Sequence, residues 1–395
     1  MVQTGAADTV AHPPSAWRRM RYWLVAHAVD DFYQGLVPAS IPFFVLERHY
    51  SYLAASGLAL AATLGSSLPQ PFLGVIADRC RVLWLAPLGL TIAGVGAGLA
   101  GLAPSYPVVW ALLLLSGIGV ASFHPAAGRD ARRDAGDSAT AMSLFAVGGS
   151  VGFFLAPALA TPALVSLGLS ATAIFIPPAV LMGFLLWRYQ LRRAVSHGAA
   201  ASTGGDDRWT PFFVLTAVAV VRSIVFFGLS TFVALFCIKH LGASQALGGY
   251  VLTALFVGGV LGTLGGGRIA DRIGMVRTVQ IGCVALVPAL VALRFSANPY
   301  AALTLALLVG VVLNVPFAVL VKLGQDYLPN RPGTASGVTL GLAVSAGGLF
   351  MPVLGSIADR HGPQAVLTLL CFVPITAVAF ALLLPPPHSR TDSGS

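Results

Sequence analysis

Three copies of one hexapeptide, Gly-x-Ile-Ala-Asp-Arg, decide the expected fold. They read GVIADR at residues 74–79, GRIADR at 267–272 and GSIADR at 355–360. The first two copies lie about half of the 395-residue chain apart, and the third follows the second after about three helices. Such spacing is typical of two parallel six-helix halves, each built from two inverted three-helix units. We therefore predict two related halves with an alternating-access site between them.

The composition is that of a membrane protein. Hydrophobic residues make up 56% of the chain and charged residues only 9%, whereas soluble domains carry about 25% charged residues. The surplus of apolar side chains must face lipid. The net charge of +9 comes from arginines in short clusters between apolar runs, which does not indicate nucleic-acid binding. The four cysteines have no paired spacing and no His-Glu-x-x-His motif occurs, so we expect no disulfide framework, metal site, cofactor or enzyme active site.

Twelve stretches are apolar enough to cross a bilayer as helices, since a spanning helix needs roughly 20 mostly apolar residues. The predicted spans are 21–46, 52–76, 82–102, 107–127, 138–161, 169–190, 211–238, 246–269, 276–296, 299–323, 333–357 and 364–386. Basic residues prefer cytoplasmic loops, and most of the 23 Lys and Arg residues share one side if the N-terminus is cytoplasmic. We therefore predict an all-α polytopic protein of the bacterial cytoplasmic (inner) membrane, with both termini in the cytoplasm.

A polar stretch, residues 191–210, divides the chain into two parts of six predicted helices each. It is rich in small residues and reads as a cytoplasmic linker. The expected units are an N-terminal bundle at 21–190 and a C-terminal bundle at 211–386. Short cytoplasmic tails, 1–20 and 387–395, flank them.

The hexapeptide copies at the two equivalent cytoplasmic positions predict a gate. Glycine lets two helices approach closely, Asp can accept from a neighbouring helix N-terminus, and Arg can pair with a carboxylate across the halves. The alternative is a solvated helix end with no further role. The candidate gating residues are Gly74, Asp78, Arg79, Gly267, Asp271 and Arg272.

Further motifs resemble the fosmidomycin-resistance (drug efflux) group of the major facilitator superfamily. They are HAVDDFYQ at 27–34, SSLPQP at 66–71, FHP at 123–125, AMSLFAVGGSVG at 141–152 and DYLPNR at 326–331. Together they span nearly the whole chain in the expected order. The resemblance implies a twelve-helix fold of two pseudo-symmetric bundles, and drug or metabolite efflux driven by the proton gradient.

Charged residues inside predicted spans are costly and are therefore functional candidates. Asp30 and Asp31 lie ~14 Å into the first span, and Arg222 lies ~16 Å into the seventh, at matching depths. We predict that an acid pairs with Arg222 across the central cavity. A carboxylate there can take up a proton while Arg stays charged, and the released Arg222 can bind an anionic substrate. The alternatives are a static ion pair that only packs the halves, or an Arg222 that lies at the cytoplasmic edge.

Other polar residues complete the candidate site. His27 lies on one helical face with the two acids and either relays protons or bonds a backbone carbonyl. Gln34 and Gln70 lie on helices that line the cavity in this fold and are predicted to touch substrate. His124 is interpreted as a helix-end residue at the membrane interface.

These residues predict a proton-coupled secondary active transporter. It would export a small drug-like or anionic metabolite by antiport, and the alternative is an importer or facilitator of a nutrient or siderophore-like metabolite. The expected partners are a small-molecule substrate, protons and the lipid bilayer. We expect a monomer.

Overall fold

The protein is described by a computed structural model that covers residues 16–79, 82–135, 139–192, 206–331, 334–335, 338–339 and 343–386. All regular structure among these residues is helical. The predicted tails, at 1–20 and 387–395, and the predicted linker, at 191–210, lie wholly or largely outside the described residues. The helices before the linker are α1 (Ala16–Glu47), α2 (Tyr52–Ser67), α3 (Gln70–Arg79), α4 (Leu85–Ala100), α5 (Tyr106–Ala135), α6 (Ala139–Leu167), the 3-10 helix η1 (Gly168–Phe175) and α7 (Ile176–Leu191).

The helices after the linker repeat this pattern of long helices and short connections. They are α8 (Trp209–His240), α9 (Gln245–Ile273), α10 (Met275–Arg294), α11 (Pro299–Asn314), α12 (Phe317–Tyr327), α14 (Ala343–Leu349), α15 (Met351–His361) and α16 (Pro363–Leu382). Each predicted span coincides with helix in the part of the chain that the structure describes. By length and composition, eight helical stretches among the described residues could cross a membrane. The count of twelve stays a prediction.

Prolines explain where two predicted spans divide into shorter helices. Pro69 and Pro71 stand where α2 gives way to α3, and Pro316 separates α11 from α12. A proline lacks the backbone N–H that a helix interior needs, so the helix bends or breaks there. Pro69 and Pro71 thus account for the break between α2 and α3. Pro38 and Pro42, by contrast, lie inside the uninterrupted α1.

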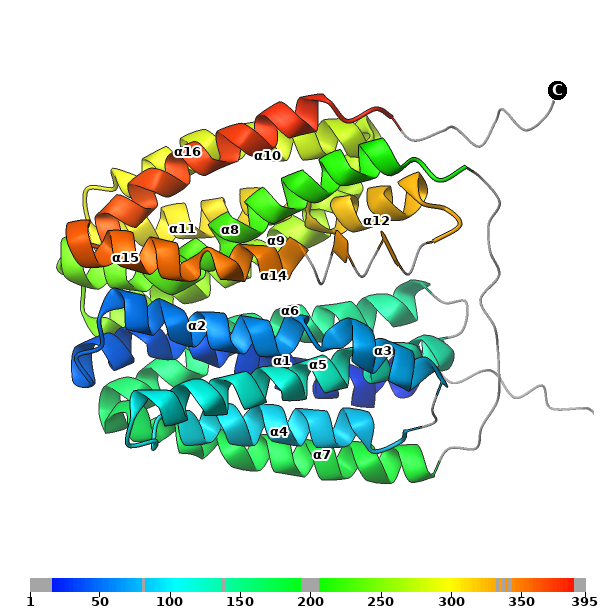
Figure 1. Cartoon of the computed structure of the whole chain (residues 1–395), viewed down its shortest axis with the longest axis horizontal. Helices are drawn as coiled ribbons and strands as arrows, with labels where there is room; N and C mark the ends of the chain where they lie inside the picture. Colours follow the sequence, from blue (N-terminus) through cyan, green and yellow to red (C-terminus); the bar gives the residue numbers. More distant parts are fainter. Residues whose placement is uncertain are drawn as a thin grey trace, which may run out of the picture.

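The helices form two layers, with α1–α7 in one and α8–α16 in the other (Figure 1). Within the first layer α1 packs along α6, and α5 packs against α2 and α4. Within the second, α9 packs along α11, and α16 packs against α8 and α10. The layers meet where α6 packs on α9 and where α2 packs on α15. The charged residues predicted to lie inside the membrane, Asp30, Asp31 and Arg222, belong to α1 and α8, the first helix of each layer.

Close helix packing rests on glycines at matching places in the two layers. A Cβ on Gly117 of α5 would overlap the backbone of α2, and one on Gly258 or Gly262 of α9 would overlap the backbone of α11. Only glycine allows backbones to approach so closely. Gly258 and Gly262, four residues apart, thus let α9 pack closely along α11.

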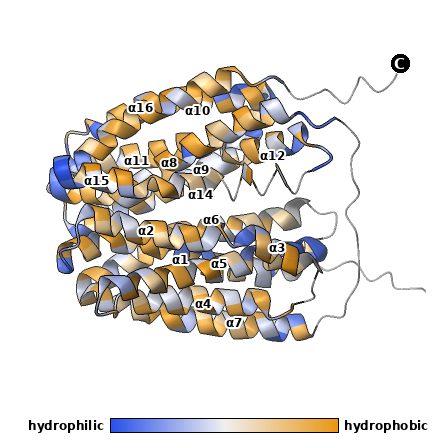
Figure 2. Ribbon diagram, viewed as in Figure 1, coloured by the Kyte–Doolittle hydropathy of each residue, from blue (hydrophilic) through white to orange (hydrophobic). Residues whose placement is uncertain are grey.

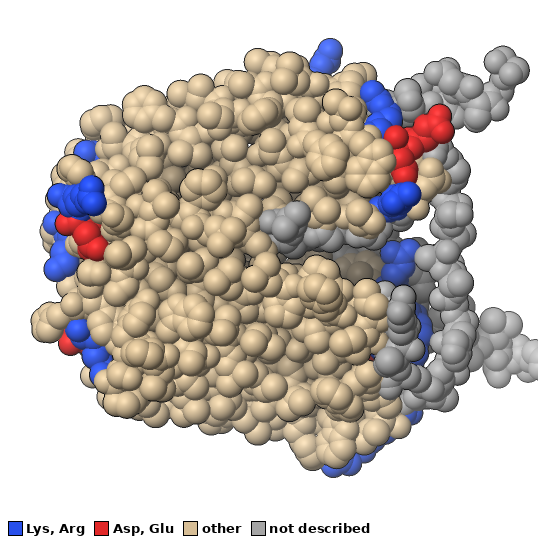
Figure 3. All heavy atoms as spheres, viewed as in Figure 1, with Lys and Arg blue, Asp and Glu red and all other residues tan. Residues whose placement is uncertain are grey.

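The surface carries a broad apolar band between two charged ends. Figure 2 shows hydrophobic residues along the length of the helices, with hydrophilic residues gathered at their ends. In the space-filling view, Lys, Arg, Asp and Glu lie at the two ends and the middle is almost free of them (Figure 3). A lipid bilayer requires this distribution, because charged groups in hydrocarbon are costly.

Candidate functional site

Three titratable side chains of α1 form the centre of the candidate site. His27, Asp30 and Asp31 are all buried. His27 and Asp31 are four residues apart, so they lie one turn apart on the same helical face. The distance from His27 Nε2 to Asp31 Oδ2 is 3.3 Å. The predicted grouping of these residues is thus seen in the structure, while their role in proton coupling stays a prediction.

A histidine from α5 completes the group and joins both acids. His124 Nδ1 lies 3.5 Å from Asp30 Oδ2, and His124 Nε2 lies 3.3 Å from Asp31 Oδ1. The interpretation of His124 as a helix-end residue at the interface is wrong, because α5 continues past Pro125 to Ala135. A proline inside a membrane helix need not end it when neighbouring helices pack around the freed backbone groups. We call His27, Asp30, Asp31 and His124 the His–Asp cluster.

Hydrogen bonds to the rest of the layer hold the cluster in place. His27 Nδ1 lies 2.8 Å from the carbonyl oxygen of Phe145 in α6, and Gln34 Nε2 donates to Asp31 Oδ1 at 2.6 Å. The side chain of Gln34, predicted to contact substrate, thus contacts the cluster. Gly149 of α6 also borders it, since a Cβ there would lie 2.6 Å from His27 Nε2.

Asp30 is the least satisfied member of the cluster. Its residue is 0% exposed, and neither carboxylate oxygen has a hydrogen-bond partner among the described residues. Buried polar groups are nearly always hydrogen-bonded. A buried carboxylate with only an imidazole 3.5 Å away therefore needs either a proton or a nearby positive charge.

The positions of hydrogen on the two imidazoles follow from their partners. Nδ1 of His27 faces the carbonyl oxygen of Phe145, and Nδ1 of His124 faces that of Val120 at 3.0 Å. Carbonyl oxygens only accept, so both Nδ1 atoms carry hydrogen. Both Nε2 atoms consequently face Asp31, where each can carry a proton or present a lone pair. The cluster can thus hold a variable number of protons.

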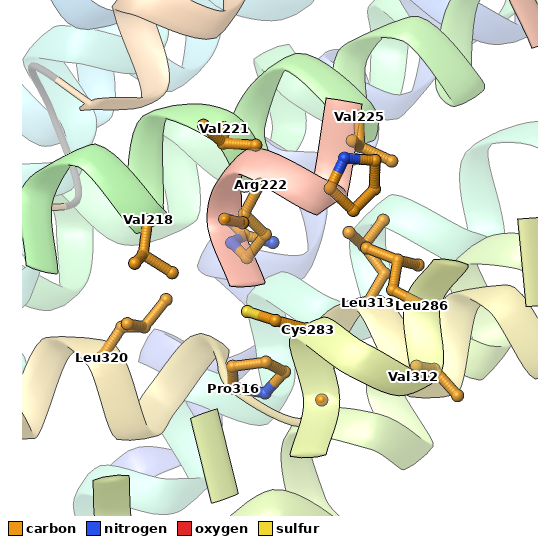
Figure 4. Close-up of a pocket in the computed structure, with 13 residues that line it drawn as sticks. Val218, Val221, Arg222, Val225, Cys283, Leu286, Val312, Leu313, Pro316 and Leu320 are labelled. Atoms are coloured by element: carbon orange, nitrogen blue, oxygen red, sulfur yellow. The ribbon is translucent and has the colours of Figure 1, made fainter. Parts of the chain in front are cut away.

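Arg222 lies apart from the cluster, which corrects the predicted ion pair. Among the described residues Arg222 has no ion pair with Asp30 or Asp31, and its guanidinium lies over the ring of Phe317, 4.6 Å from the centroid. It lines a pocket inside the second layer, between α8, α10, α11, α12 and α16 (Figure 4). The pocket is otherwise almost wholly apolar, with Val218, Val221, Val225, Gly282, Cys283, Leu286, Val312, Leu313, Pro316, Leu320, Pro374 and Ala377.

The failed pairing has a physical reason. The matching depth of Arg222 and the acids concerns their positions along the helix axes, and depth says nothing about rotation around those axes. The acids turn toward His124 in their own layer, and Arg222 turns toward Phe317 in its own layer. A cation over an aromatic face is stabilised without a carboxylate. A substrate-binding role for Arg222 stays a prediction.

The predicted gating residues differ in what the structure describes. The side chains of Asp78 and Arg79 lie outside the described residues, although the backbone of α3 runs to Arg79. Asp271 and Arg272, at the end of α9, are exposed and form no ion pair or hydrogen bond within the described ranges. Among the described residues, a Cβ on Gly74 would meet only Pro125 of its own layer, at 3.8 Å, and one on Gly267 would meet no atom within 4 Å. Gln70 is the first residue of α3 and is half-buried.

The third hexapeptide makes the contact that the sequence predicted for the other two. Asp359 of α15 accepts hydrogen bonds from the backbone N–H groups of Tyr52, at 2.6 Å, and Leu53, at 3.0 Å. These groups begin α2, so the carboxylate caps a helix N-terminus across the layers. A Cβ on Gly355 would lie 2.8 Å from the carbonyl oxygen of Tyr52. This contact joins the layers at the end opposite to Asp271.

A polar network near the C-terminal end of α5 was not predicted from the sequence. Asp134 accepts from Trp23 Nε1 at 2.6 Å and from the Tyr189 hydroxyl at 3.0 Å. Arg129 donates to the carbonyl oxygen of Ala77, near the end of α3. The run RDARRD at residues 129–134 was the available signal. The first hexapeptide, at the end of α3, is thus bonded within its own layer.

Comparisons with known proteins agree with this architecture. The family model described as Major Facilitator Superfamily matches residues 23–348. The chain is 28% identical to the fosmidomycin resistance protein of Escherichia coli (strain K12), with 96% of each chain covered. It is also 28% identical to the MFS-type transporter YfnC of Bacillus subtilis (strain 168), with 91% of each covered.

Solved structures share the fold at low sequence identity. A bacterial homologue of the human lysosomal transporter Spinster, in an inward-facing and occupied conformation, superposes with a TM-score of 0.77 at 16% identity, covering 94% of this chain and 97% of that one. A mutant of the nucleoside transporter NupG superposes with a TM-score of 0.72 at 13% identity, covering 93% of this chain and 99% of that one. The predicted all-α, two-bundle membrane fold is confirmed.

Proposed function

Because the chain belongs to the Major Facilitator Superfamily, we propose that this multi-pass membrane transporter is a proton-coupled antiporter that exports a small drug-like or anionic metabolite. The observation that carries the proposal is the His–Asp cluster. It gathers two carboxylates and two imidazoles, with oxygen–nitrogen distances of 3.3 to 3.5 Å, inside a helix bundle. Titratable groups in a membrane interior mark proton relays.

Alternating access is supported by the uneven closure of the two ends. At one end Asp359 caps α2 and joins the layers. At the other end Figure 3 shows the surface hollowed between the layers. To move its substrate across the membrane, such a transporter opens the joined end and closes the open end.

The direction of transport is proposed from similarity. The fosmidomycin resistance protein matches the chain over 96% of both sequences, and its name indicates a role in drug resistance. We therefore propose export, from a cytoplasmic (inner) membrane and by a monomer, with fosmidomycin as the first compound to test.

The deciding experiment uses purified protein in liposomes with an imposed pH gradient of either sign. Fosmidomycin that moves against its own gradient, opposite to the flow of protons, supports antiport. Movement in the same direction as the protons would instead support the importer alternative. Movement that does not respond to either gradient would contradict proton coupling.

A further inference from the structure

Three side chains of the His–Asp cluster converge as metal ligands do. One nitrogen of His27, one oxygen of Asp31 and one nitrogen of His124 all lie within 4.8 Å of one another. We propose that these three residues form a binding site for a divalent transition-metal cation of the zinc class. The site shares these residues with the proposed proton relay, but its binding of a metal can be tested without any transport.

The spacing of the ligand atoms suits one ion. Zinc binds His nitrogen and carboxylate oxygen at about 2.0–2.2 Å, so two ligands of a tetrahedral ion lie about 3.4 Å apart. Nε2 of His27 lies 3.3 Å from Oδ2 of Asp31, and Nε2 of His124 lies 3.3 Å from Oδ1, so the ion would lie beside both oxygens of the carboxylate. Two imidazoles and a carboxylate favour zinc, cobalt or iron over magnesium or calcium, which prefer all-oxygen sites.

The surrounding groups hold the ligands in the orientation that a metal requires. A metal-binding histidine nearly always donates its second N–H to a carbonyl or a carboxylate. His27 has the carbonyl oxygen of Phe145 at 2.8 Å from Nδ1, and His124 has that of Val120 at 3.0 Å. Asp31, the third ligand, accepts from Gln34 at 2.6 Å. Each ligand therefore has its own supporting hydrogen bond.

Asp30 has a role in this arrangement that explains its burial. It lies 3.5 Å from Nδ1 of His124, on the side of the ring away from Asp31. A carboxylate behind a metal-bound histidine raises the basicity of that ligand. Its charge and that of Asp31 would together balance a divalent cation, and buried charges are expected to be paired or to surround a metal.

A glycine of α6 borders two of the proposed ligands. A Cβ on Gly149 would lie 2.6 Å from His27 Nε2 and would also crowd Asp31. With hydrogen in that place, an atom can approach both ligands at once. The side chain of His124 is 23% exposed, which leaves a route of entry and a fourth coordination position for water or a ligand.

The test measures binding of Zn²⁺ alone to the purified full-length chain by titration calorimetry, with Co²⁺ absorption as a second readout. We expect saturable binding of one ion and visible bands typical of four-coordinate Co²⁺. His124→Gln and Asp31→Asn should abolish both signals. Asp30→Asn, which changes no ligand, should weaken Zn²⁺ about 10–100-fold, as loss of an outer-shell partner does.

Matched variants separate binding from misfolding. His361→Gln, at the exposed end of α15, should bind Zn²⁺ as the unmodified chain does. Gly149→Ala should lose binding although all three ligands remain. Each variant is first checked for a single size-exclusion peak and for retained helicity. Absence of saturable Zn²⁺ binding in the unmodified chain, or equal binding by the His27→Gln/His124→Gln chain, would overturn the proposal and leave a cluster that holds protons only.

Discussion

The first helices of the two layers, α1 and α8, carry their intramembrane charges in opposite ways. In α1 the two acids are placed against imidazoles of α1 and α5, all within one layer. In α8 the single Arg222 forms no ion pair with a described carboxylate and stacks on Phe317 of its own layer. One layer therefore holds a cluster of titratable groups, and the other holds a positive charge placed over an aromatic ring.

The separate charged contacts of α1 and α8 affect how the two layers can move relative to each other. Among the described residues, Asp30, Asp31 and Arg222 make their charged contacts within their own layers, so no ion pair of theirs has to break when the layers rock. In the described part of the chain, hydrogen bonds join the layers at the cap of Asp359 on α2, at one end of the molecule. We infer that Asp30 and Asp31 exchange protons. The α2–α15 contact instead governs closure of the end at which Asp359 caps α2.

The largest expected effect comes from removing the central carboxylate. Asp31 contacts both imidazoles and Gln34, so Asp31→Asn leaves the shape but removes the charge that holds them. Transport driven by a pH gradient should fall to the level of empty liposomes, whereas counterflow without a gradient should persist. Uptake of fosmidomycin by proteoliposomes measures both.

The control for this change is an acid outside the cluster. Asp326→Asn, at an exposed position on α12, should transport as the unmodified protein does. Asp30→Asn should have a smaller effect than Asp31→Asn, because among the described residues Asp30 forms an ion pair with His124 only, whereas Asp31 pairs with His27 and His124. Full gradient-driven activity in the chain with both Asp30→Asn and Asp31→Asn would contradict proton coupling through α1.

The next effect concerns the glycines of two hexapeptide copies. A Cβ on Gly355 would overlap α2, whereas one on Gly267 meets open space. Overpacking costs about 1–3 kcal/mol, so Gly355→Ala should open the joined end. Spin labels at Leu53 and His361, in a chain without the native cysteines, should then show a population of longer distances. Gly267→Ala, the matched control, should leave the distances unchanged, and an unchanged distribution in Gly355→Ala would rule out a tight contact there.

A smaller effect is expected from the charged residue of the same copies. Asp359→Asn keeps a weaker cap on α2 but loses its charge, which is worth about 0.3–1 kcal/mol at a helix N-terminus. The fraction of molecules with a longer distance between labels at Leu53 and His361 should rise a few-fold. Asp271→Asn should shift the protein the opposite way, because its contact would form only when the other end closes. Shifts of the same sign in both variants would contradict gates at opposite ends.

Much of this fold could be predicted from the sequence, because it depends on length, apolarity and repetition. The helices follow from apolar runs, and the break between α2 and α3 follows from Pro69 and Pro71. The hexapeptide repeat predicted the two layers. The repeat could not show which copy forms a contact in a given state, since all three share the residues that make it. Asp359 makes the contact, although its copy lies outside the two equivalent positions from which the gate was predicted.

The site was predicted in part, for a reason of geometry. His27, Asp30 and Asp31 are close in the chain, so helical periodicity already groups them. His124 is distant in sequence and joins them only because α5 packs against α1. The rotation of α8, which decides whether Arg222 faces the first layer, depends on packing with its neighbours α12 and α16 and leaves no signal in spacing. Charge depth alone therefore led to a wrong pair.

The smallest expected effect sharpens the role of Arg222. If its pocket attracts acidic compounds, Arg222→Lys should weaken binding of fosmidomycin and Arg222→Ala should weaken it more, by several-fold, while gradient-driven transport continues. A lysine keeps the charge but not the planar fork that suits an acidic group.

The Phe317→Leu variant separates a binding role of Arg222 from a role in packing. It removes a cation–π contact worth about 0.5–2 kcal/mol, so it should lower thermal stability but leave the affinity near that of the unmodified chain. Equal loss of affinity in Phe317→Leu and Arg222→Ala would show that Arg222 acts through packing of the second layer. Loss of all gradient-driven transport in Arg222→Ala would mean that the two layers share their charges after all, contrary to the separate contacts that Arg222 and the acids make within their own layers.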